Sequence, residues 1–546
     1  MLGEKIVEHM KQFGQRPAIQ INDTGDVYTF AQILQRVEYY RQQLILRQLP
    51  AGCVAAVSLE NVVEYIAVLL ALWQHDCIVV PMEECSAHAL SQVQAKAGLD
   101  YLLCGEMRPG GAVLSESVYL IPQGGQAPNS TPAPIDAAVF LYTSGTTGLP
   151  KCVVFSHEAM YRNIADLAQS LNLAPSDVCY TPVSHLITSA LTTIYLPGLI
   201  SGATVVIKKT FLPGAMKNVI NRYRVTVLFS VPFVYAKLLE SPAIDQIEWD
   251  HVRLCLTSSS YMAPQHFVGL YEKSGKVLHS IYCSSECGVI SYQASDDLTK
   301  AQSSVGHPVK GVYIKIVASD GAEVPHGVCG EILVAGAHCA SGYYNDDICQ
   351  QRLISKQYPD YFHTGDFGCV TQEGIVLKGR ISQTMNIAGH LVNPQEVEDR
   401  LILHPGLQDA AVFSLPDDDH NERIYAKVVA ADRENPPDEE DVIRFCRDGM
   451  EDYKVPRKII FVDEIDLTAH ARPELRTDRI GADLTRQVDL DGRVDGHEAV
   501  VLRDDVGVVR VSDIHHQHAR VVVDEVVNGF RTCLLYTSDA AAEARS

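Results

Sequence analysis

The chain has 546 residues, of which 47% are hydrophobic and 21% charged, a composition typical of a globular protein with more than one core. Its 45 Lys and Arg residues are outnumbered by 67 Asp and Glu residues, giving a formal net charge of -22. This balance argues against nucleic acid as a main partner, because phosphate backbones are bound by basic surfaces. A small anionic ligand is not excluded, because it responds to a local site.

The beginning of the chain and its most apolar run do not predict membrane insertion. The start, MLGEKIVEHMKQFGQRPAI, lacks the apolar core of a signal peptide. The run IAVLLALW at 66–73 lies between Glu64 and Asp76 and is too short to span a bilayer, so it predicts a buried helix. The 15 Cys residues are scattered and form no CxxC pair, which indicates a reduced, cytoplasmic protein without a transmembrane segment.

Helix and strand patterns alternate up to about residue 378. FAQILQRVEYYRQQL has helical periodicity, whereas AAVFLY, CVVFSH, ATVVIKK and VTVLFSVP are typical of buried strands. Around 312–336 two strand patterns surround an SDG turn, which predicts an antiparallel pair. From residue 384 a compact βαβ-like pattern follows, with a helix near 438–449. These patterns predict an α/β protein with a second, small domain of about a hundred residues.

The end of the chain has a different composition. No Lys occurs after Lys458 and no Pro after Pro473, and the last residues, CLLYTSDAAAEARS, resemble translated sequencing adapters. We therefore expect residues 486–546 to be an atypical tail that is not native sequence. The HHQH cluster at 515–518 is weak evidence for a metal site, because no second group of ligands accompanies it.

The stretch LYTSGTTGLPK at 141–151 combines flexible glycines, hydroxyl donors and a final cation, which suits a phosphate. It is not the Walker pattern, because apolar runs on both sides predict a loop between two strands. A Gly/Thr-rich hairpin turn is the alternative interpretation. The candidate phosphate ligands are Thr143, Ser144, Gly145, Thr146, Thr147, Gly148 and Lys151.

Three further motifs suit a nucleotide. In YCSSECG, Tyr282 can stack on a base, Ser285 can contact phosphate and Glu286 can hold Mg²⁺. In YFHTGDFG, Asp366 can accept hydrogen bonds from both ribose hydroxyls. In KGRISQTMNIAGHLVNPQEVE, Arg380 can reach a ribose or a phosphate. Each motif alone is also typical of an ordinary loop, turn or interdomain linker.

Together, in this order and spacing, the four motifs resemble the adenylate-forming superfamily, which includes acyl-CoA synthetases, peptide-synthetase adenylation domains and firefly luciferase. The resemblance implies that residues 143–151 form the phosphate loop and that Glu286 is the Mg²⁺ ligand. It makes Asp366 the ribose ligand and Arg380 a nucleotide contact just before a hinge. Lys151 and Glu286 then belong to the catalytic machinery.

The resemblance also implies the architecture. A large N-terminal domain of parallel and mixed sheets flanked by helices, with a small β-barrel, would precede a small mobile α+β domain. The expected ranges are 1–379 for the AMP-binding domain, 380–383 for the hinge, 384–485 for the small domain and 486–546 for the tail. Family members usually have Asp or Lys at the hinge, where this chain has Ser382.

The acyl substrate is predicted from the region after Asp177. In TPVSHLITSA, His185 occupies the place of a pocket His of acyl-CoA synthetases, although a structural His is the alternative. No acidic residue lies between Asp177 and Glu240, so a plain carboxylic acid fits better than an amino acid. TSSSYMAP stands where family members often have Ser-Gly-Gly-Ala, which places Ser258, Ser259 and Ser260 near the adenine and acyl groups.

One departure concerns the last family motif, a Gly-Lys whose Lys contacts the reacting carboxylate and the α-phosphate. Alignment by spacing places Ala471 and Arg472 over it. Arg differs from Lys in size, planarity and hydration, so this is not a conservative change. Either Arg472 serves as a weakened catalytic residue or the reading frame has already shifted here.

The sequence therefore predicts an ATP-dependent carboxylate–CoA ligase that uses ATP, Mg²⁺ and coenzyme A. Two alternatives stay open. One is an acyl-AMP ligase that loads a carrier protein instead of CoA. The other is a nucleotide-binding pseudoenzyme that is impaired in adenylation because Arg472 replaces the Lys.

Overall fold

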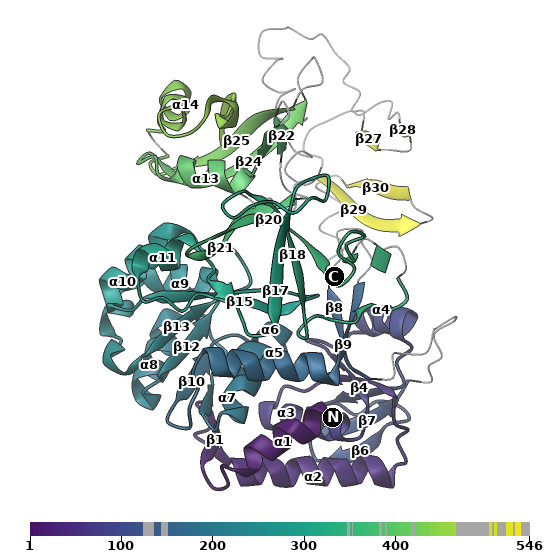
Figure 1. Ribbon diagram of the computed structural model, residues 1–546. Coiled ribbons are helices and arrows are strands. Elements are labelled where there is room, and N and C mark those ends of the chain that lie inside the picture. Colours follow the sequence, from purple (N-terminus) through teal and green to yellow (C-terminus); the bar gives the residue numbers. More distant parts are fainter. Residues whose placement is uncertain are drawn as a thin grey trace. The chain divides into compact units, whose positions relative to one another are not determined.

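The computed structural model (Figure 1) divides into two compact units, Met1–Pro473 and Glu474–Ser546. The structure describes residues 1–123, 136–143, 151–346, 350–351, 353–381, 385–387, 390–416, 422–433, 435–465, 502–504, 507–509, 520–527 and 530–536. In the second unit two antiparallel pairs are described: β27 (Leu502–Asp504) with β28 (Gly507–Val509), and β29 (Arg520–Val527) with β30 (Phe530–Tyr536).

The first unit contains a nine-stranded sheet in the order β16-β15-β14-β13-β12-β10-β11-β1-β2. Neighbouring strands are parallel from β14 through β13, β12, β10 and β11 to β1. At the edges, the pairs β1–β2, β14–β15 and β15–β16 are antiparallel. The strands are β1 (Pro17–Ile21), β2 (Val27–Thr29), β10 (Val178–Thr181), β11 (Thr204–Ile207), β12 (Val227–Ser230), β13 (Leu254–Thr257), β14 (Leu278–Ser284), β15 (Gly288–Tyr292) and β16 (His307–Pro308).

A second sheet of eight strands has the order β19-β9-β8-β4-β3-β5-β7-β6. Strands β8, β4, β3 and β5 are parallel, and the remaining pairs are antiparallel. The strands are β3 (Val54–Ser58), β4 (Ile78–Pro81), β5 (Tyr101–Cys104), β6 (Ala112–Ser115), β7 (Val118–Pro122), β8 (Ala137–Thr143), β9 (Lys151–Ser156) and β19 (Gly342–Tyr343).

One apolar core joins the inner faces of both sheets. It contains Val79 and Val153 from the eight-stranded sheet and Val205 and Phe229 from the nine-stranded sheet. Helix α3 (Val62–Gln74) lies within this core, and nearly all of its residues are buried, as its apolar sequence predicts. The expectation of a buried helix at IAVLLALW is therefore confirmed.

The other helices of the large region pack against the sheets, and the longer ones among them are amphipathic and bury one face, whereas α7 (Leu196–Ile200) is buried throughout. The amphipathic pattern at FAQILQRVEYYRQQL forms α2, which Thr29 caps by accepting the N–H of Gln32. The helices are α1 (Leu2–Lys11), α2 (Phe30–Leu46), α4 (Ala87–Ala97), α5 (His157–Ser170), α6 (Thr188–Ala190), α7 (Leu196–Ile200), α8 (Pro213–Tyr223), α9 (Pro232–Leu239), α10 (Pro264–Ser274) and α11 (Leu298–Ser303).

A four-stranded antiparallel sheet forms the β-rich piece that the sequence predicts after residue 311. Its order is β17 (Val312–Val317), β18 (Gly330–Gly336), β20 (Phe362–Thr371) and β21 (Gly374–Arg380). The SDG sequence makes a turn in which Gly321 has a φ of 86°. This turn is only part of a longer connection between β17 and β18, so the two strands pair as predicted but through a longer loop.

Residues 385–461 have a hydrophobic cluster of their own. Two helices, α13 (Pro394–Ile402) and α14 (Glu439–Arg447), accompany the sheet β24 (Leu407–Pro416), β25 (Glu422–Ala430) and β26 (Lys458–Phe461), light green in Figure 1. A short pair, β22 (Met385–Ile387) with β23 (His390–Val392), precedes them. The chain is thus an α/β protein with a separate C-terminal region.

The cysteines and the lengths of the helices are two further features of the described residues. The thirteen cysteines whose side chains are described are all free, and most are buried. Among the helices of the described residues, none combines the length and the apolar character that crossing a bilayer requires.

Candidate active site

The predicted phosphate loop connects two neighbouring strands of the eight-stranded sheet. Strand β8 ends at Thr143, which pairs in register with Lys151 at the start of β9. The prediction that this loop joins two strands is therefore confirmed. The side chain of Thr143 lies outside what the structure describes, as do Ser144, Gly145, Thr146, Thr147 and Gly148. Lys151 is half-buried.

Glu286 lies at the tip of the hairpin formed by β14 and β15. Ser285 beside it is exposed and Glu286 is half-buried. The hairpin turns at Gly288, which has a φ of 62° and no room for a Cβ, because that atom would lie 1.9 Å from Oδ1 of Asn163. The same Oδ1 accepts the N–H of Val289 at 2.7 Å. The local fold therefore requires a glycine directly after the CSSEC sequence.

Asn163 on α5 is a positioning residue that sequence reasoning missed. It is 3% exposed, and while its Oδ1 binds the hairpin, its Nδ2 donates to the carbonyl of His338 at 2.9 Å. One buried amide thus joins the Glu286 hairpin to the segment that leads into β19. No sequence signal marked it, because Asn163 stands within an ordinary amphipathic helix.

Asp366 on β20 is brought together with both Tyr282 and Arg380. It pairs in register with Arg380 across the β20–β21 hairpin, and Nε of Arg380 lies 2.7 Å from its Oδ1. The Tyr282 hydroxyl donates to Oδ2 at 2.5 Å. Asp366 is 6% exposed and Tyr282 is 7% exposed. Three of the predicted nucleotide ligands therefore form one hydrogen-bonded group.

Burial is the largest influence on the pKa values of Asp366 and Tyr282. Burial raises the pKa of Asp366, and the nearby carboxylates of Glu286 and Glu331 raise it further. The charge of Arg380 and the hydrogen bond from Tyr282 lower the pKa of Asp366 and offset part of the rise. Burial and the Asp366 charge also raise the pKa of Tyr282, so its hydroxyl keeps its proton and donates.

Tyr343 on β19 is a second residue that sequence reasoning missed. Its hydroxyl donates to Oε1 of Glu286 at 2.5 Å, and Nζ of Lys151 lies 5.1 Å from the centroid of its ring. It therefore touches two predicted catalytic groups at once. The GYYND sequence that contains it carries no signal of its own for such a role.

The described residues around Glu286 fit a magnesium ion of the kind that arrives with a nucleotide. They form no group of three or more His, Cys, Asp or Glu side chains that could hold a metal alone. Oε2 of Glu286 has no hydrogen-bond partner among the described side chains. Mg²⁺ is commonly bound by one or two carboxylates together with substrate phosphates, and Glu286 matches this arrangement.

His185, the predicted acyl-pocket residue, is fully buried in the loop after β10. Its Nε2 donates to the carbonyl of Leu59 at 2.9 Å, and Nδ1 has no partner among the described residues. Its ring meets that of Tyr65 edge-on, with the centroids 5.0 Å apart. Burial lowers the pKa of His185 to about 4, so it is neutral at pH 7. A neutral His is compatible with an uncharged acyl group beside it.

Ser258, Ser259 and Ser260 follow β13 and differ in burial. Ser258 is 4% exposed, and its Oγ lies 3.3 Å from Sγ of Cys283 on β14. Ser259 and Ser260 are exposed. Ser259 has a φ of 81°, a left-handed conformation that costs a residue with a Cβ free energy. This is a physical reason for the glycines that family members often have in this segment.

We expect the substitution Ser259→Gly to stabilise the protein by about 1 kcal/mol. Relief of the left-handed conformation contributes roughly 1–2 kcal/mol, from which the greater freedom of Gly in the unfolded chain removes about 0.5–1 kcal/mol. Ser260→Gly is the matched control, because Ser260 has no positive φ and should only lose stability. Urea unfolding measures the free energy of unfolding of both variants. If both substitutions destabilise the protein equally, the backbone of Ser259 is not strained.

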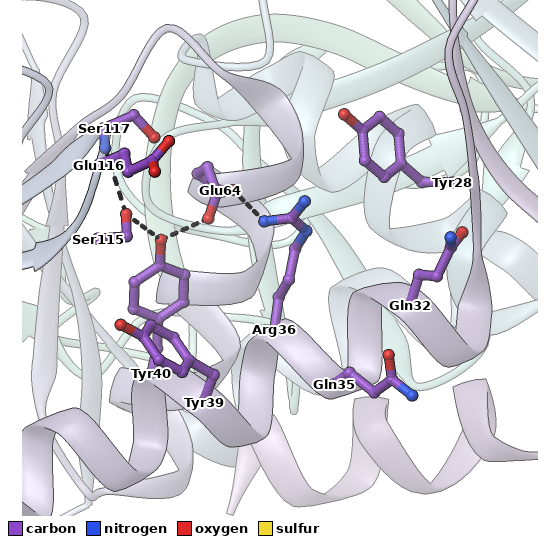
Figure 2. A pocket seen from close by; sticks show the side chains of 10 residues that line it. All are labelled: Tyr28, Gln32, Gln35, Arg36, Tyr39, Tyr40, Glu64, Ser115, Glu116 and Ser117. Atoms are coloured by element: carbon purple, nitrogen blue, oxygen red, sulfur yellow. Dashed lines mark hydrogen bonds and ion pairs between the residues drawn. The ribbon is translucent and has the colours of Figure 1, made fainter.

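The cavity drawn in Figure 2, of about 630 Å³, lies near α2 and the β6–β7 turn, and none of the described site residues above lines it. Its buried carboxylate, Glu64, is already bound by Arg36 at 2.5 Å and by the Tyr40 hydroxyl at 2.5 Å. Because these two partners satisfy the buried carboxylate of Glu64, we interpret this cluster as structural. The lining residues are Tyr28, Gln32, Gln35, Arg36, Tyr39, Tyr40, Glu64, Ser115, Glu116 and Ser117.

Besides the loop residues named above, two predicted residues lie outside the described parts of the chain. They are Ser382 at the expected hinge and Arg472 at the expected catalytic Lys position. Their roles stay predictions.

Family models match most of the chain. The model described as AMP-binding enzyme matches residues 6–344, and the model described as AMP-binding enzyme C-terminal domain matches residues 396–472. The first match alone covers more than half of the sequence. The chain therefore belongs to the AMP-binding enzymes of the adenylate-forming superfamily.

The relatives and solved structures that resemble this chain have low sequence identity to it. 4-Coumarate–CoA ligase 5 from Oryza sativa subsp. japonica is 31% identical over 60% of this chain and 63% of its own length. Oxalate–CoA ligase from Saccharomyces cerevisiae is 28% identical over 62% of each chain. These alignments span less than two thirds of either relative. The ATP-bound structure of MatB from Rhodopseudomonas palustris has the same fold, with a TM-score of 0.74 and 22% identity over 87% of this chain and 100% of that chain.

Proposed function

We propose that this chain is an ATP-dependent carboxylate–CoA ligase. The observation that carries the proposal is a pair of side-chain clusters at the β14–β15 and β20–β21 hairpins. Lys151 and Glu286 meet at Tyr343, and Asp366, Arg380 and Tyr282 form the neighbouring group. The relatives named as CoA ligases support this choice of reaction class.

The proposed reaction has two steps. A carboxylate oxygen attacks the α-phosphate of ATP, forming an acyl-adenylate and releasing pyrophosphate. The thiol of CoA then attacks the acyl carbon, loses its proton and releases AMP, leaving a thioester. Since the first step brings two anions together, positioning and charge neutralisation are the main tasks of the protein.

The described side chains divide these tasks. Lys151 supplies a positive charge next to the phosphate loop, and Asp366 accepts the ribose hydroxyls. A carboxylate has about four lone-pair sites, so Asp366 can keep Tyr282 and Arg380 while it binds a ribose. Glu286 would hold Mg²⁺, which would neutralise phosphate charge. The small domain would rotate about the hinge near Ser382 between the two steps.

The substrate class follows from the neutral His185 and from the lack of acidic residues between Asp177 and Glu240. No carboxylate there could hold the amino group of an amino acid. We therefore infer a plain carboxylic acid. The free, scattered cysteines favour action in the cytoplasm.

Exchange of labelled pyrophosphate into ATP, measured with a panel of aliphatic and aromatic acids, tests the proposal. We expect at least one acid to give exchange above the acid-free control, and CoA to convert the adenylate to a thioester. Transfer to a carrier protein but not to CoA would instead support the acyl-AMP ligase. Nucleotide binding without exchange in the chain as written would support the pseudoenzyme, and recovery of exchange after Arg472→Lys would assign the defect to Arg472.

A further inference from the structure

Lys151 and Glu286, two predicted catalytic residues of opposite charge, both contact the side chain of Tyr343. The Tyr343 hydroxyl donates to Oε1 of Glu286 at 2.5 Å, and the ammonium of Lys151 lies 5.1 Å from the centre of the Tyr343 ring. Among the described side chains, Lys151 and Glu286 form no ion pair with each other. The aromatic ring thus contacts both charges while the two stay apart.

The backbone fixes the ring in this place. Tyr343 pairs antiparallel with Val153 of β9, the strand that begins at Lys151. Three residues earlier, the N–H of Ala340 donates to the carbonyl of Glu286 at 2.8 Å. The short segment 340–344 is therefore hydrogen-bonded both to the strand of the lysine and to the loop of the carboxylate.

The segment has little freedom to shift. Gly342 has a φ of 130°, and a Cβ there would lie 2.2 Å from Oε1 of Gln350. The same Oε1 accepts the N–H of Tyr343 at 2.6 Å. Because the amide of Gln350 already holds this backbone, the phenol is delivered to one position between the two charged groups.

We propose that Tyr343 is a positioning residue that orients Glu286 toward the metal of metal–ATP and keeps Lys151 from pairing with it. This inference rests on the proposed function. A direct ion pair between Lys151 and Glu286 would neutralise the two charges that a nucleotide and its metal need separately. The hydroxyl fixes Oε1, which leaves Oε2 of Glu286 directed elsewhere, and the ring face attracts the ammonium of Lys151.

Two substitutions separate the hydroxyl from the ring. Tyr343→Phe removes the hydrogen bond to Glu286 and keeps the ring face for Lys151. Tyr343→Leu removes both. Tyr344→Phe is the matched control, because this neighbouring tyrosine is buried and its ring stacks on Phe140, with the centroids 4.9 Å apart.

Binding is measured without catalysis, using Mn²⁺ as a paramagnetic probe together with a non-hydrolysable ATP analogue. Tyr343→Phe is expected to weaken Mn²⁺ binding in the ternary complex at least about tenfold, the scale of one hydrogen bond to a charged group. The affinity for the metal-free nucleotide should change less than about twofold, because Lys151 keeps its ring contact. Tyr343→Leu should weaken both, and Tyr344→Phe neither.

A double-mutant cycle with Glu286→Gln tests whether the hydroxyl acts through Glu286. In the Glu286→Gln protein, the further change Tyr343→Phe should have little effect on Mn²⁺. Equal Mn²⁺ affinity in Tyr343→Phe and the unaltered protein, or an equal loss in both backgrounds, would overturn the inference. If the unaltered protein binds no nucleotide, the proposed function itself fails. If it binds nucleotide but Tyr343→Phe leaves the Mn²⁺ affinity unchanged, only the inference about Tyr343 fails. Melting temperatures show whether each variant is folded.

Discussion

Replacing Asp366 by Ala is expected to weaken ATP binding at least about tenfold. In the proposed site the Asp366 carboxylate accepts two ribose hydroxyls, and the loss of such charge-assisted hydrogen bonds costs roughly 2–5 kcal/mol. Tyr282 and Arg380 also lose their shared partner, so the pocket itself changes. Isothermal calorimetry with ATP measures the affinity, and an unchanged value would contradict the assignment of Asp366 to the nucleotide site.

Asp366→Asn distinguishes a lost ligand from a damaged fold. The Asn oxygen can still accept from Tyr282 or Arg380, but it binds at most one ribose hydroxyl strongly and carries no charge. Folding raises the pKa of Asp366, so its contribution to stability is present at low pH and is lost as the pH rises through the folded pKa. At a pH above that folded pKa the substitution should therefore preserve the melting temperature while it weakens ATP binding. A large drop in melting temperature would point to a structural role instead.

The secondary structure could be predicted in large part because the local patterns agree with the packing. The apolar run in α3 is buried on all sides, and the short β-branched runs at β8 and β9 are strands of the interior of a sheet. The SDG turn was predicted as the whole connection between β17 and β18. Turn residues identify a turn but not the number of residues that follow it before the next strand begins.

The candidate site could be predicted where its chemistry lies in one short motif. Asp366 and Arg380 are fourteen positions apart and face each other across one hairpin, so their pairing follows from local structure. Tyr343 and Glu286 are 57 residues apart, and Asn163 and Val289 are 126 apart. Such contacts depend on how distant strands are brought together, and neither Tyr343 nor Asn163 stands in a string that indicates a nucleotide. The physical link between the motifs was therefore missed.

The final motif of the family is the place where this chain departs most from the expected chemistry. The C-terminal family model matches residues 396–472, so its match ends at Arg472, the residue that we predict to stand in the place of the catalytic Lys. A Lys ammonium is a compact charge that can reach both the substrate carboxylate and the α-phosphate. The planar guanidinium of Arg472 has its donors in a fixed fork and is larger. We therefore expect adenylation to be slow in the chain as written.

Arg472→Lys, combined with Ala471→Gly to restore the turn, is expected to raise the rate of pyrophosphate exchange about 10²-fold or more, the effect of one positioned charge in a transition state. Thioester formation from a supplied acyl-adenylate and CoA should barely change, because that step uses the other face of the small domain after rotation. Arg476→Lys makes the same chemical change four residues later and should alter neither step. Equal exchange rates before and after the Arg472 change would show that Arg472 is not at the catalytic position.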